Sequence, residues 1–260
     1  MGSVVTPVSA DSYLRNILAR EAVDSTMSSP LRALQAEVAG FCRDFCGAHL
    51  LEIYPTGAFE KGTANASGIA IDFLASFSPA SPTPVHELYE ALFDGLQSEG
   101  LEPVRRDVSV ALMLEGVAVD IIPGRREAMA SDVHELWLTR RGRSVKTNLT
   151  QHVLDTISAG RGDEIRVLKI WRDQLGIDFP SFYLELSVAA ALRKRPAGTL
   201  AENVWNVLAY LESLFPARPA LDPVNANNIV SDQLGPPGRG AVRRAAQLAR
   251  ASRAWSEIIQ

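Results

Sequence analysis

The sequence predicts an α+β protein with a β-rich first half and a helical second half. Hydrophobic residues make up 47% of its 260 residues and charged residues 22%, which is the balance of a folded globular chain. Alternating apolar residues and hairpin signals are concentrated between positions 50 and 147, whereas helical spacing dominates from position 148 onward. We therefore expect two lobes, residues 1–147 and residues 148–260, with a cleft between them.

The elements of the first half are predicted from apolar spacing and from turn residues. Helices are expected at residues 12–23, 30–49 and 82–99, and strands at residues 50–54, 69–77, 108–122 and 134–146. Ser28-Ser29-Pro30 is typical of an N-cap followed by proline at the first helical position. Each of the last two strand regions is expected to form a hairpin, one turning at Glu115-Gly116 and the other at Arg141-Gly142.

The second half is predicted to be almost entirely helical. Helices are expected at residues 149–158, 164–175, 181–192, 200–214 and 240–259, and residues 215–238 are predicted to be a proline-rich loop. The last helix is locally basic, which usually marks a solvated face and alternatively a face for product or nucleic acid.

Composition and charge exclude several classes of protein. Lys and Arg number 26 against 30 Asp and Glu, and this net charge of −4 argues against strong general binding to nucleic acid. No apolar run approaches the roughly 20 residues that a membrane span needs, and the first residues lack a signal-peptide pattern. Two cysteines cannot form a disulfide framework. We therefore expect a cytoplasmic protein with no membrane contact.

Two strands carry single carboxylates in otherwise apolar runs. A glycine-flanked turn at residues 57–62 allows backbone N–H groups to converge on a phosphate, and the strand that follows contains Asp72. About 50 residues later a second strand contains Asp120. Buried carboxylates are costly unless they are paired or bind a cation, so these two predict a metal site on adjacent strands. Taken singly, each could instead be a strand-end residue that faces water.

These motifs, taken in order, resemble those of the DNA polymerase β-like nucleotidyltransferases. More narrowly they resemble the cGAS/DncV-like nucleotidyltransferases (CD-NTases) of bacterial antiphage signalling and the oligoadenylate synthetases. That family has a Gly-Ser turn ending in Gly-Thr, an Asp-x-Asp strand and a third Asp on a later strand. Gly57, Gly62 and Thr63 match the turn, Asp72 matches the second Asp and Asp120 matches the third.

The resemblance continues into the helical half. Lys169 stands where the family has a triphosphate-binding lysine, and Ser181-Phe182 resembles a Ser-Tyr pair whose serine contacts phosphate and whose aromatic ring stacks on the base. The neighbouring Tyr183 is an alternative stacking residue. Residues 222–228 resemble the family's Asp-Pro…Asn loop. The nucleotide-binding residues that the resemblance implies are Gly57, Ala58, Lys61, Gly62, Thr63, Lys169, Ser181, Phe182 and Tyr183.

The resemblance implies a polymerase β-like lobe, with a mixed sheet and flanking helices, followed by a helical lobe. It implies a template-independent nucleotidyltransferase that makes a short nucleotide second messenger, cyclic or linear, from NTPs or dNTPs in antiphage defence. Mg²⁺ is the expected cofactor, with Mn²⁺ as an alternative, because oxygen ligands and a triphosphate suit a hard cation. The implied partners are nucleoside triphosphates and a downstream effector that reads the product.

The sequence departs from the family pattern at two positions. Ala58 replaces the serine of the Gly-Ser turn, which removes a hydroxyl group and leaves the backbone N–H groups. Ala70 stands where the first Asp of Asp-x-Asp belongs, and in a strand it faces the same side as Asp72. We interpret Ala70 as an engineered Asp→Ala change in an otherwise active enzyme. The alternatives are a natural pseudoenzyme that binds nucleotide, and, for the activity itself, nucleotidyl transfer to tRNA or protein.

Two further groups of side chains are interpreted as structural. Cys42 and Cys46 lie four residues apart, with His49 a turn later, but no fourth zinc ligand is evident. The cysteines are therefore expected to be small buried hydrophobic residues. His152 has no catalytic partner pattern and is expected to shape the protein around it.

Overall fold

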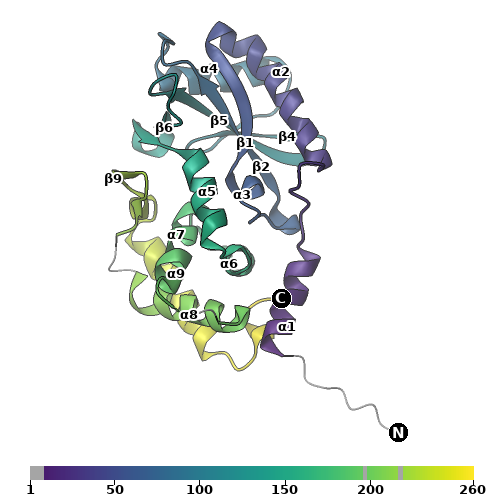
Figure 1. Cartoon of the computed structure of the whole chain (residues 1–260), viewed down its shortest axis with the longest axis vertical. Helices are drawn as coiled ribbons and strands as arrows, with labels where there is room; N and C mark the ends of the chain where they lie inside the picture. The colour runs from purple at the N-terminus through teal and green to yellow at the C-terminus, as the bar shows by residue number, and fades with distance from the viewer. Residues whose placement is uncertain (1–8, 196–197, 216–218) are drawn as a thin grey trace. The chain divides into compact units, whose positions relative to one another are not determined.

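The computed structural model describes residues 9–195, 198–215 and 219–260 (Figure 1). They form two compact units, each with its own core. The sheet unit comprises Val23–Ser158 and Asp222–Asn228, and the helical unit comprises the described residues up to 22, Ala159–Leu221 and Ile229–Gln260. This division differs from a single boundary after residue 147, because the first helix packs with the helical unit and a late hairpin packs with the sheet. No helix in the described residues is long and apolar enough to span a membrane.

The sheet unit is built on one mixed sheet. Its strands are β1 (Leu50–Thr56), β2 (Ala70–Phe77), β3 (Val104–Arg105), β4 (Val110–Leu114), β5 (Val117–Arg126), β6 (His134–Leu138) and β7 (Arg143–Thr147). Their order is β1-β2-β5-β4-β3, and β6 and β7 extend the sheet beyond the end of β4. Strands β2 and β5 are parallel, and every other pair among these strands is antiparallel. The short β3 is the one strand of this sheet that the sequence did not predict.

Helices cover one face of this sheet. Helices α2 (Leu34–Cys46) and α4 (Val85–Ser98) lie on that face, and the unit also contains α3 (Gly57–Glu60) and α5 (Leu149–Ala159). On that face, Ile71, Phe73, Val119 and Ile121 are almost fully buried and pack with apolar residues of α2 and α4. Because side chains alternate along a strand, the residues between them point to the other face. The apolar strand pattern therefore leaves Asp72 and Asp120 together on the face away from this core.

Local signals in the sequence correctly placed several boundaries. Ser29 Oγ accepts the N–H of Leu31 (3.3 Å) with Pro30 at the first helical position, and a 3₁₀ turn, Pro30–Ala33, leads into α2. Glu115 and Gly116 have φ values of 47° and 79°, and this left-handed pair joins β4 to β5 in the predicted hairpin. Gly142 has φ 57° in the turn before β7.

The helical unit consists of α1 (Ala10–Arg20), α6 (Gly162–Gln174), α7 (Ser181–Leu192), α8 (Leu200–Ser213) and α9 (Pro236–Ala251). Its core contains Leu14, Trp171, Tyr183 and Phe215, all at most 2% exposed. Two bonds from Arg166 Nη2, to the carbonyls of Leu18 (2.9 Å) and Glu21 (2.8 Å), fasten the end of α1 to this unit. They explain why the N-terminal helix belongs here.

The prediction of a proline-rich loop at residues 215–238 was incomplete. The described part of this segment contains a two-stranded sheet, β8 (Leu221–Asp222) and β9 (Asn225–Ile229), and α9 already begins at Pro236. Proline fits the first turn of a helix because the N–H groups there have no helical partner, so Pro236 and Pro237 start this helix rather than preventing it.

Candidate functional site

The two strand carboxylates stand side by side. Asp72 and Asp120 pair directly in the register of the parallel strands β2 and β5. Both are half-buried, whereas their strand neighbours Ile71 and Val119 are fully buried on the opposite face. Neighbouring strands lie about 4.8 Å apart, so the two carboxylates extend from one face within reach of one cation. Two like charges this close favour a bound cation between them.

The glycine turn lies against one of these carboxylates. Gly57 has φ +65°, and a Cβ built on it would lie 1.8 Å from Oδ2 of Asp72. Its predecessor Thr56 pairs with Asp72 across β1 and β2. Glycine is therefore required at position 57 for two reasons, its backbone conformation and its close approach to the carboxylate.

The turn is held by hydrogen bonds and by one buried ring. The N–H of Thr63 donates to the carbonyl of Ala58 (2.9 Å), and Gly62, at φ +66°, closes the turn. Phe59 is fully buried beneath it, and the Arg32 guanidinium lies 5.2 Å from the centre of that ring. Arg32 also pairs with Glu60 at 3.0 Å. Thr63 is buried, while Ala58 and Lys61 are partly exposed on the same turn.

A serine that the sequence analysis missed contacts the second carboxylate. Ser109 Oγ donates to Oδ1 of Asp120 at 2.6 Å, and Ser109 is 5% exposed. Its loop is braced by the Tyr89 hydroxyl, which donates to the carbonyls of Arg106 (2.9 Å) and Ser109 (3.0 Å). The register counted back from the Glu115-Gly116 turn would have found it, because that register places position 109 on the face of Asp120.

Position 70 lies on the same face as the carboxylates. Ala70 pairs with Ala118 two residues before the Asp72–Asp120 pair, and both alanines are half-buried. Within the described residues, no group of three or more His, Cys, Asp or Glu side chains could hold a metal ion. The two carboxylates still fit Mg²⁺, which is commonly held by one or two carboxylates together with substrate phosphates and water.

The residues expected from the helical half lie in the helical unit, in three different environments. Lys169 of α6 is buried, and its Nζ lies 2.9 Å from Oε1 of Glu185 on α7. Ser181 begins α7, is exposed and accepts a hydrogen bond from Arg172 Nη1 at 2.9 Å. Phe182 is partly buried against the apolar core.

Tyr183 is a correction to the sequence analysis. It is 1% exposed and packs between Phe179 and Phe215, whose ring centres lie 5.3 Å and 4.9 Å from its own. Burial raises the pKa of its hydroxyl to about 12. A ring enclosed in this way offers no face to a base, so Phe182 is the remaining candidate for stacking.

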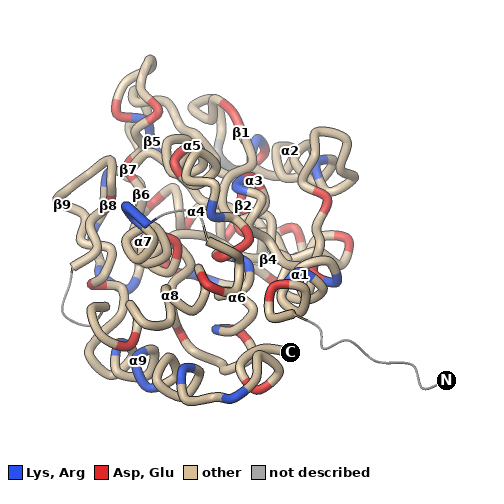
Figure 2. Tube along the Cα trace, turned by 60° about the horizontal axis from the view of Figure 1, so that its bottom comes forward, with Lys and Arg blue, Asp and Glu red and all other residues tan. Residues whose placement is uncertain are grey.

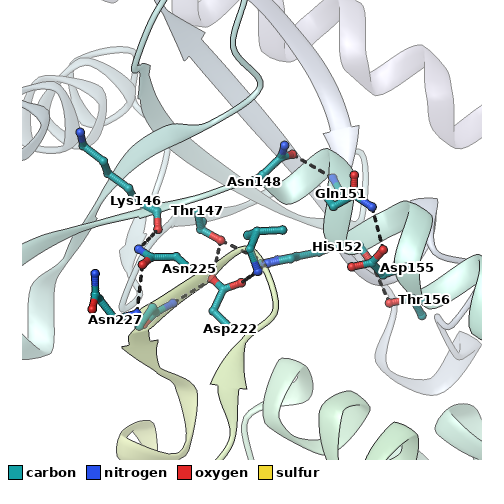
Figure 3. Close-up of polar contacts among 12 residues, drawn as sticks. Lys146, Thr147, Asn148, Gln151, His152, Asp155, Thr156, Asp222, Asn225 and Asn227 are labelled. Atoms are coloured by element: carbon teal, nitrogen blue, oxygen red, sulfur yellow. Dashed lines mark hydrogen bonds and ion pairs between the residues drawn. The ribbon is translucent and has the colours of Figure 1, made fainter.

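The segment that resembles the family's Asp-Pro…Asn loop is fixed by one buried carboxylate (Figure 3). Asp222 accepts hydrogen bonds from Thr147 Oγ1 (2.6 Å), His152 Nε2 (2.8 Å) and Asn228 Nδ2 (3.0 Å). Burial by itself would raise the pKa of Asp222, but the bonds from His152 and Thr147 outweigh it and lower the pKa to about 2. The structural role predicted for His152 agrees with this cluster, which fastens the β8–β9 hairpin to β7 and α5.

The cysteine pair shows no sign of a zinc site in the part that is described. Cys42 is fully buried in the core of the sheet unit, as predicted for a small hydrophobic residue, and His49 is exposed. The side chain of Cys46 lies outside the described residues.

Comparisons with known proteins show which solved structures share this fold. No protein-family model and no curated protein matches the sequence. Among solved structures, the Bradyrhizobium diazoefficiens CD-NTase CdnG in complex with GTP has a TM-score of 0.73 at 14% identity, covering 95% of this chain and 92% of that one. The E. coli MS115-1 CdnC with ATP gives 0.67 at 22% identity, covering 85% and 82%. A cytoplasmic RNA terminal U-transferase gives 0.61 at 12% identity, covering 94% of each chain.

These likenesses extend over most of the chain and match the observed elements. In this chain a mixed sheet with flanking helices is followed by a set of helices. The chain therefore has the polymerase β-like nucleotidyltransferase fold, in the form found in the cGAS/DncV-like nucleotidyltransferases.

Proposed function

We propose that this chain is a template-independent nucleotidyltransferase scaffold that binds a nucleoside triphosphate with a divalent cation. With Asp at position 70 it would make a short nucleotide second messenger for a downstream effector in antiphage defence. The observation that carries this proposal is the in-register pair Asp72 and Asp120 beside the glycine turn. The fold likeness to CD-NTases supports it further.

Each group of residues has a distinct task in this proposal. Mg²⁺ held by Asp72 and Asp120 would neutralise charge on the triphosphate and on the departing pyrophosphate. The backbone of the turn from Gly57 to Thr63 would bind the phosphates, with Lys61 at its rim. Lys169 and Ser181 would bind the triphosphate and Phe182 would stack on the base, as the family resemblance implies.

The residue at position 70 decides the rate of transfer. Ala70 faces the side of Asp72 and precedes it by two residues, so an Asp there would add a third carboxylate roughly 6–7 Å along the strand. Without that group the attacking hydroxyl lacks one of its anchoring ligands, while the contacts to the triphosphate remain. We therefore expect the Ala70 chain to bind nucleotide and to turn it over very slowly.

The test compares Ala70→Asp with Ala118→Asp. Both alanines are half-buried, pair with each other and share one face, so the two variants carry the same added charge on neighbouring strands. Each protein is incubated with every NTP and dNTP and with Mg²⁺ or Mn²⁺, pyrophosphate release is followed and the products are resolved by mass spectrometry. Ala70→Asp should raise the rate on the order of 10³-fold, and Ala118→Asp should not.

Two outcomes would redirect the proposal. An inactive Ala70→Asp that still binds triphosphate would support the pseudoenzyme, in which the fold senses nucleotide without turnover. Equal activity of both variants would contradict the role assigned to position 70.

A second candidate is nucleotidyl transfer to a polymer. The fold likeness to an RNA terminal U-transferase favours it. Incubating Ala70→Asp with labelled NTPs together with tRNA or protein acceptors separates the two functions. A labelled polymer supports this candidate, and a released small product supports the second messenger.

A further inference from the structure

Four arginines gather around the tip of the β6–β7 hairpin without acidic partners. These arginines are Arg106, Arg140, Arg141 and Arg143. None of them forms an ion pair with the described residues. Nearby arginines behave differently, because Arg105 pairs with Glu90 and Arg125 with Glu135, both at 2.6 Å. A local excess of positive charge therefore stands on a chain whose net charge is −4.

The hairpin tip is held rigidly against the loop that carries Arg106. The backbone N–H groups of Thr139 and Arg140 donate to the carbonyl (2.8 Å) and the carboxylate (2.9 Å) of Asp107. Thr139 Oγ1 also donates to the carbonyl of Arg106 at 3.1 Å. Asp107 is the one acidic residue in these two segments, and its carboxylate is taken up by the hairpin tip. These bonds fix the backbone of the two segments, and a single carboxylate, that of Asp107, stands there against four guanidinium groups.

One of these guanidinium groups has an unsatisfied donor. Arg141 Nη2 is buried and has no hydrogen-bond partner among the described residues. A buried donor without an acceptor is costly, so a turn of the Arg141 side chain that brings Nη2 to an anionic oxygen would be favourable. Guanidinium groups bind phosphate through paired N–H donors, so this arrangement suits a phosphate chain better than an isolated carboxylate.

A pocket continues from Arg143 along β7. It has a volume of about 400 Å³ and lies wholly within the sheet unit. Its lining includes Arg143, Asn225, Asn227, three valines (Val133, Val145 and Val224) and the ion pair of Lys146 with Glu127 (2.9 Å), in which the charge of Glu127 is balanced. Asn225 donates to the carbonyl of Lys146 at 2.7 Å and accepts the N–H of Asn227 at 3.1 Å (Figure 3). The side-chain amide of Asn227 makes no hydrogen bond to the described residues, and the residue is exposed. Three valines and one available side-chain amide in the lining suit the flat face and polar edge of a nucleobase.

We propose that the hairpin tip and this pocket together bind a single-stranded oligonucleotide. Arg140, Arg141 and Arg143, flanked by Arg106, hold successive phosphates, and the pocket takes one base with Asn227 at its polar edge. This surface adjoins the loop of Ser109, which contacts Asp120, but it uses neither Asp72 nor Asp120 and requires no turnover. Its existence therefore does not depend on the proposed nucleotidyl transfer.

Helix α9 provides the matched control because it also carries arginines (Figure 2). Two of them are occupied: Arg239 bonds to the carbonyls of Ser231 and Leu234, and Arg250 pairs with Glu212 at 2.8 Å. The other two within α9, Arg243 and Arg244, are exposed. Arg243→Glu with Arg244→Glu changes the net charge by the same amount as Arg140→Glu with Arg143→Glu.

The experiment measures fluorescence anisotropy of a 5′-labelled oligoadenylate of ten nucleotides with the full chain at several salt concentrations. The hairpin double variant should bind at least 10-fold more weakly. Its salt dependence should fall by about 1.4 in log–log slope, the value for two lost phosphate contacts on a single strand. The α9 double variant should bind within about 2-fold of the unmodified chain. Equal losses in both variants, or no binding by the unmodified chain, would overturn the proposal.

A second arm tests the pocket. Asn227→Ala should weaken binding about 3-fold without changing the salt slope, because it removes a neutral contact. Unlabelled oligoadenylate should compete better than tripolyphosphate at the same phosphate concentration. Equal competition by tripolyphosphate, with Asn227→Ala unchanged, would mean that the surface binds only polyphosphate and would refute the oligonucleotide site. Circular dichroism melting confirms that all variants fold.

Discussion

In the sheet unit the candidate carboxylates stand on a face that strand register determines, whereas in the helical unit Phe182 and Tyr183 lie on α7, a helix that is apolar on nearly every side. Asp72 and Asp120 must share a face because β2 and β5 are parallel and in register. Helix α7 has buried residues around most of its circumference, so spacing alone gives no direction to Phe182 or Tyr183. In the strands, the order of the motifs was therefore enough to place both carboxylates on one face. In α7 it left open which of the two aromatic side chains is accessible.

The two units also differ in how they bury charge. In the sheet unit, Asp222 receives three side-chain hydrogen bonds and the backbone N–H of Val224 (3.0 Å). In the helical unit, the buried pair Lys169 and Glu185 joins α6 to α7. A carboxylate held by this many donors fixes a segment in place, while the buried ion pair holds two helices together.

The largest expected effect is the loss of the Asp222 cluster. Asp222→Ala should lower the free energy of unfolding by about 4 kcal/mol, because it leaves buried donors from Thr147, His152 and Asn228 unsatisfied. Chemical denaturation measures this loss. A change below about 1 kcal/mol would show that the β8–β9 hairpin is held by other contacts.

The same carboxylate makes stability depend on pH. The folded pKa of Asp222, about 2, lies below its ordinary value of 3.8. Its contribution of about 2 kcal/mol is therefore complete above pH ~4 and is lost as the pH falls through ~2. Asp222→Asn should remove this part of the acid dependence.

Two glycines with the same backbone conformation allow the cost of backbone strain to be measured separately from the cost of a steric clash. Gly57 and Gly62 have φ of +65° and +66°, but a Cβ at Gly57 would collide with Asp72, whereas a Cβ at Gly62 meets nothing within 4 Å. Gly57→Ala should cost about 3 kcal/mol of stability and Gly62→Ala about 1 kcal/mol. Thermal unfolding of both variants measures the difference, and equal costs would contradict the contact between the turn and the carboxylate.

The sequence predicted the positions of side chains in strands better than their environments in helices and between distant segments. Alternation in β2 and β5 located both carboxylates and the alanines beside them, and turn chemistry located the hairpins and the proline-capped helix. Ser109 escaped because an isolated serine before a strand carries no motif, although register would have placed it. The environment of Tyr183 and the bonds of Asp222 depend on contacts between distant segments, which no local pattern contains.

Two buried serines of the sheet unit test which hydrogen bonds support the metal site. Ser109→Ala should weaken binding of Mn²⁺ with ATP about 10-fold, because Asp120 loses the hydrogen bond that orients it. Ser76 is fully buried on the same face but contacts His134 Nε2 at 2.9 Å instead of a carboxylate. Ser76→Ala should therefore leave the affinity for Mn²⁺ unchanged, as measured by electron paramagnetic resonance. Equal effects of both variants would reduce the role of Ser109 to packing.

The smallest expected effect lies in α7. Tyr183→Phe removes a buried hydroxyl that has no partner among the described residues, so stability should change by less than about 1 kcal/mol and nucleotide affinity should stay the same. Phe182→Ala should weaken nucleotide binding about 10-fold through lost stacking. Equilibrium binding of a fluorescent ATP analogue compares the two variants. The reverse order would restore Tyr183 as the stacking residue.

The most direct test of the account is the divalent-ion affinity of the Asp72–Asp120 pair. Mn²⁺ binding in the presence of ATP is measured by electron paramagnetic resonance for the unmodified chain, Asp72→Asn, Asp120→Asn and the double variant. Each single variant should weaken binding at least about 30-fold, and the double variant should be little worse than either, because the two carboxylates act on one ion. Unchanged affinity in either single variant would contradict a metal site on the face shared by β2 and β5.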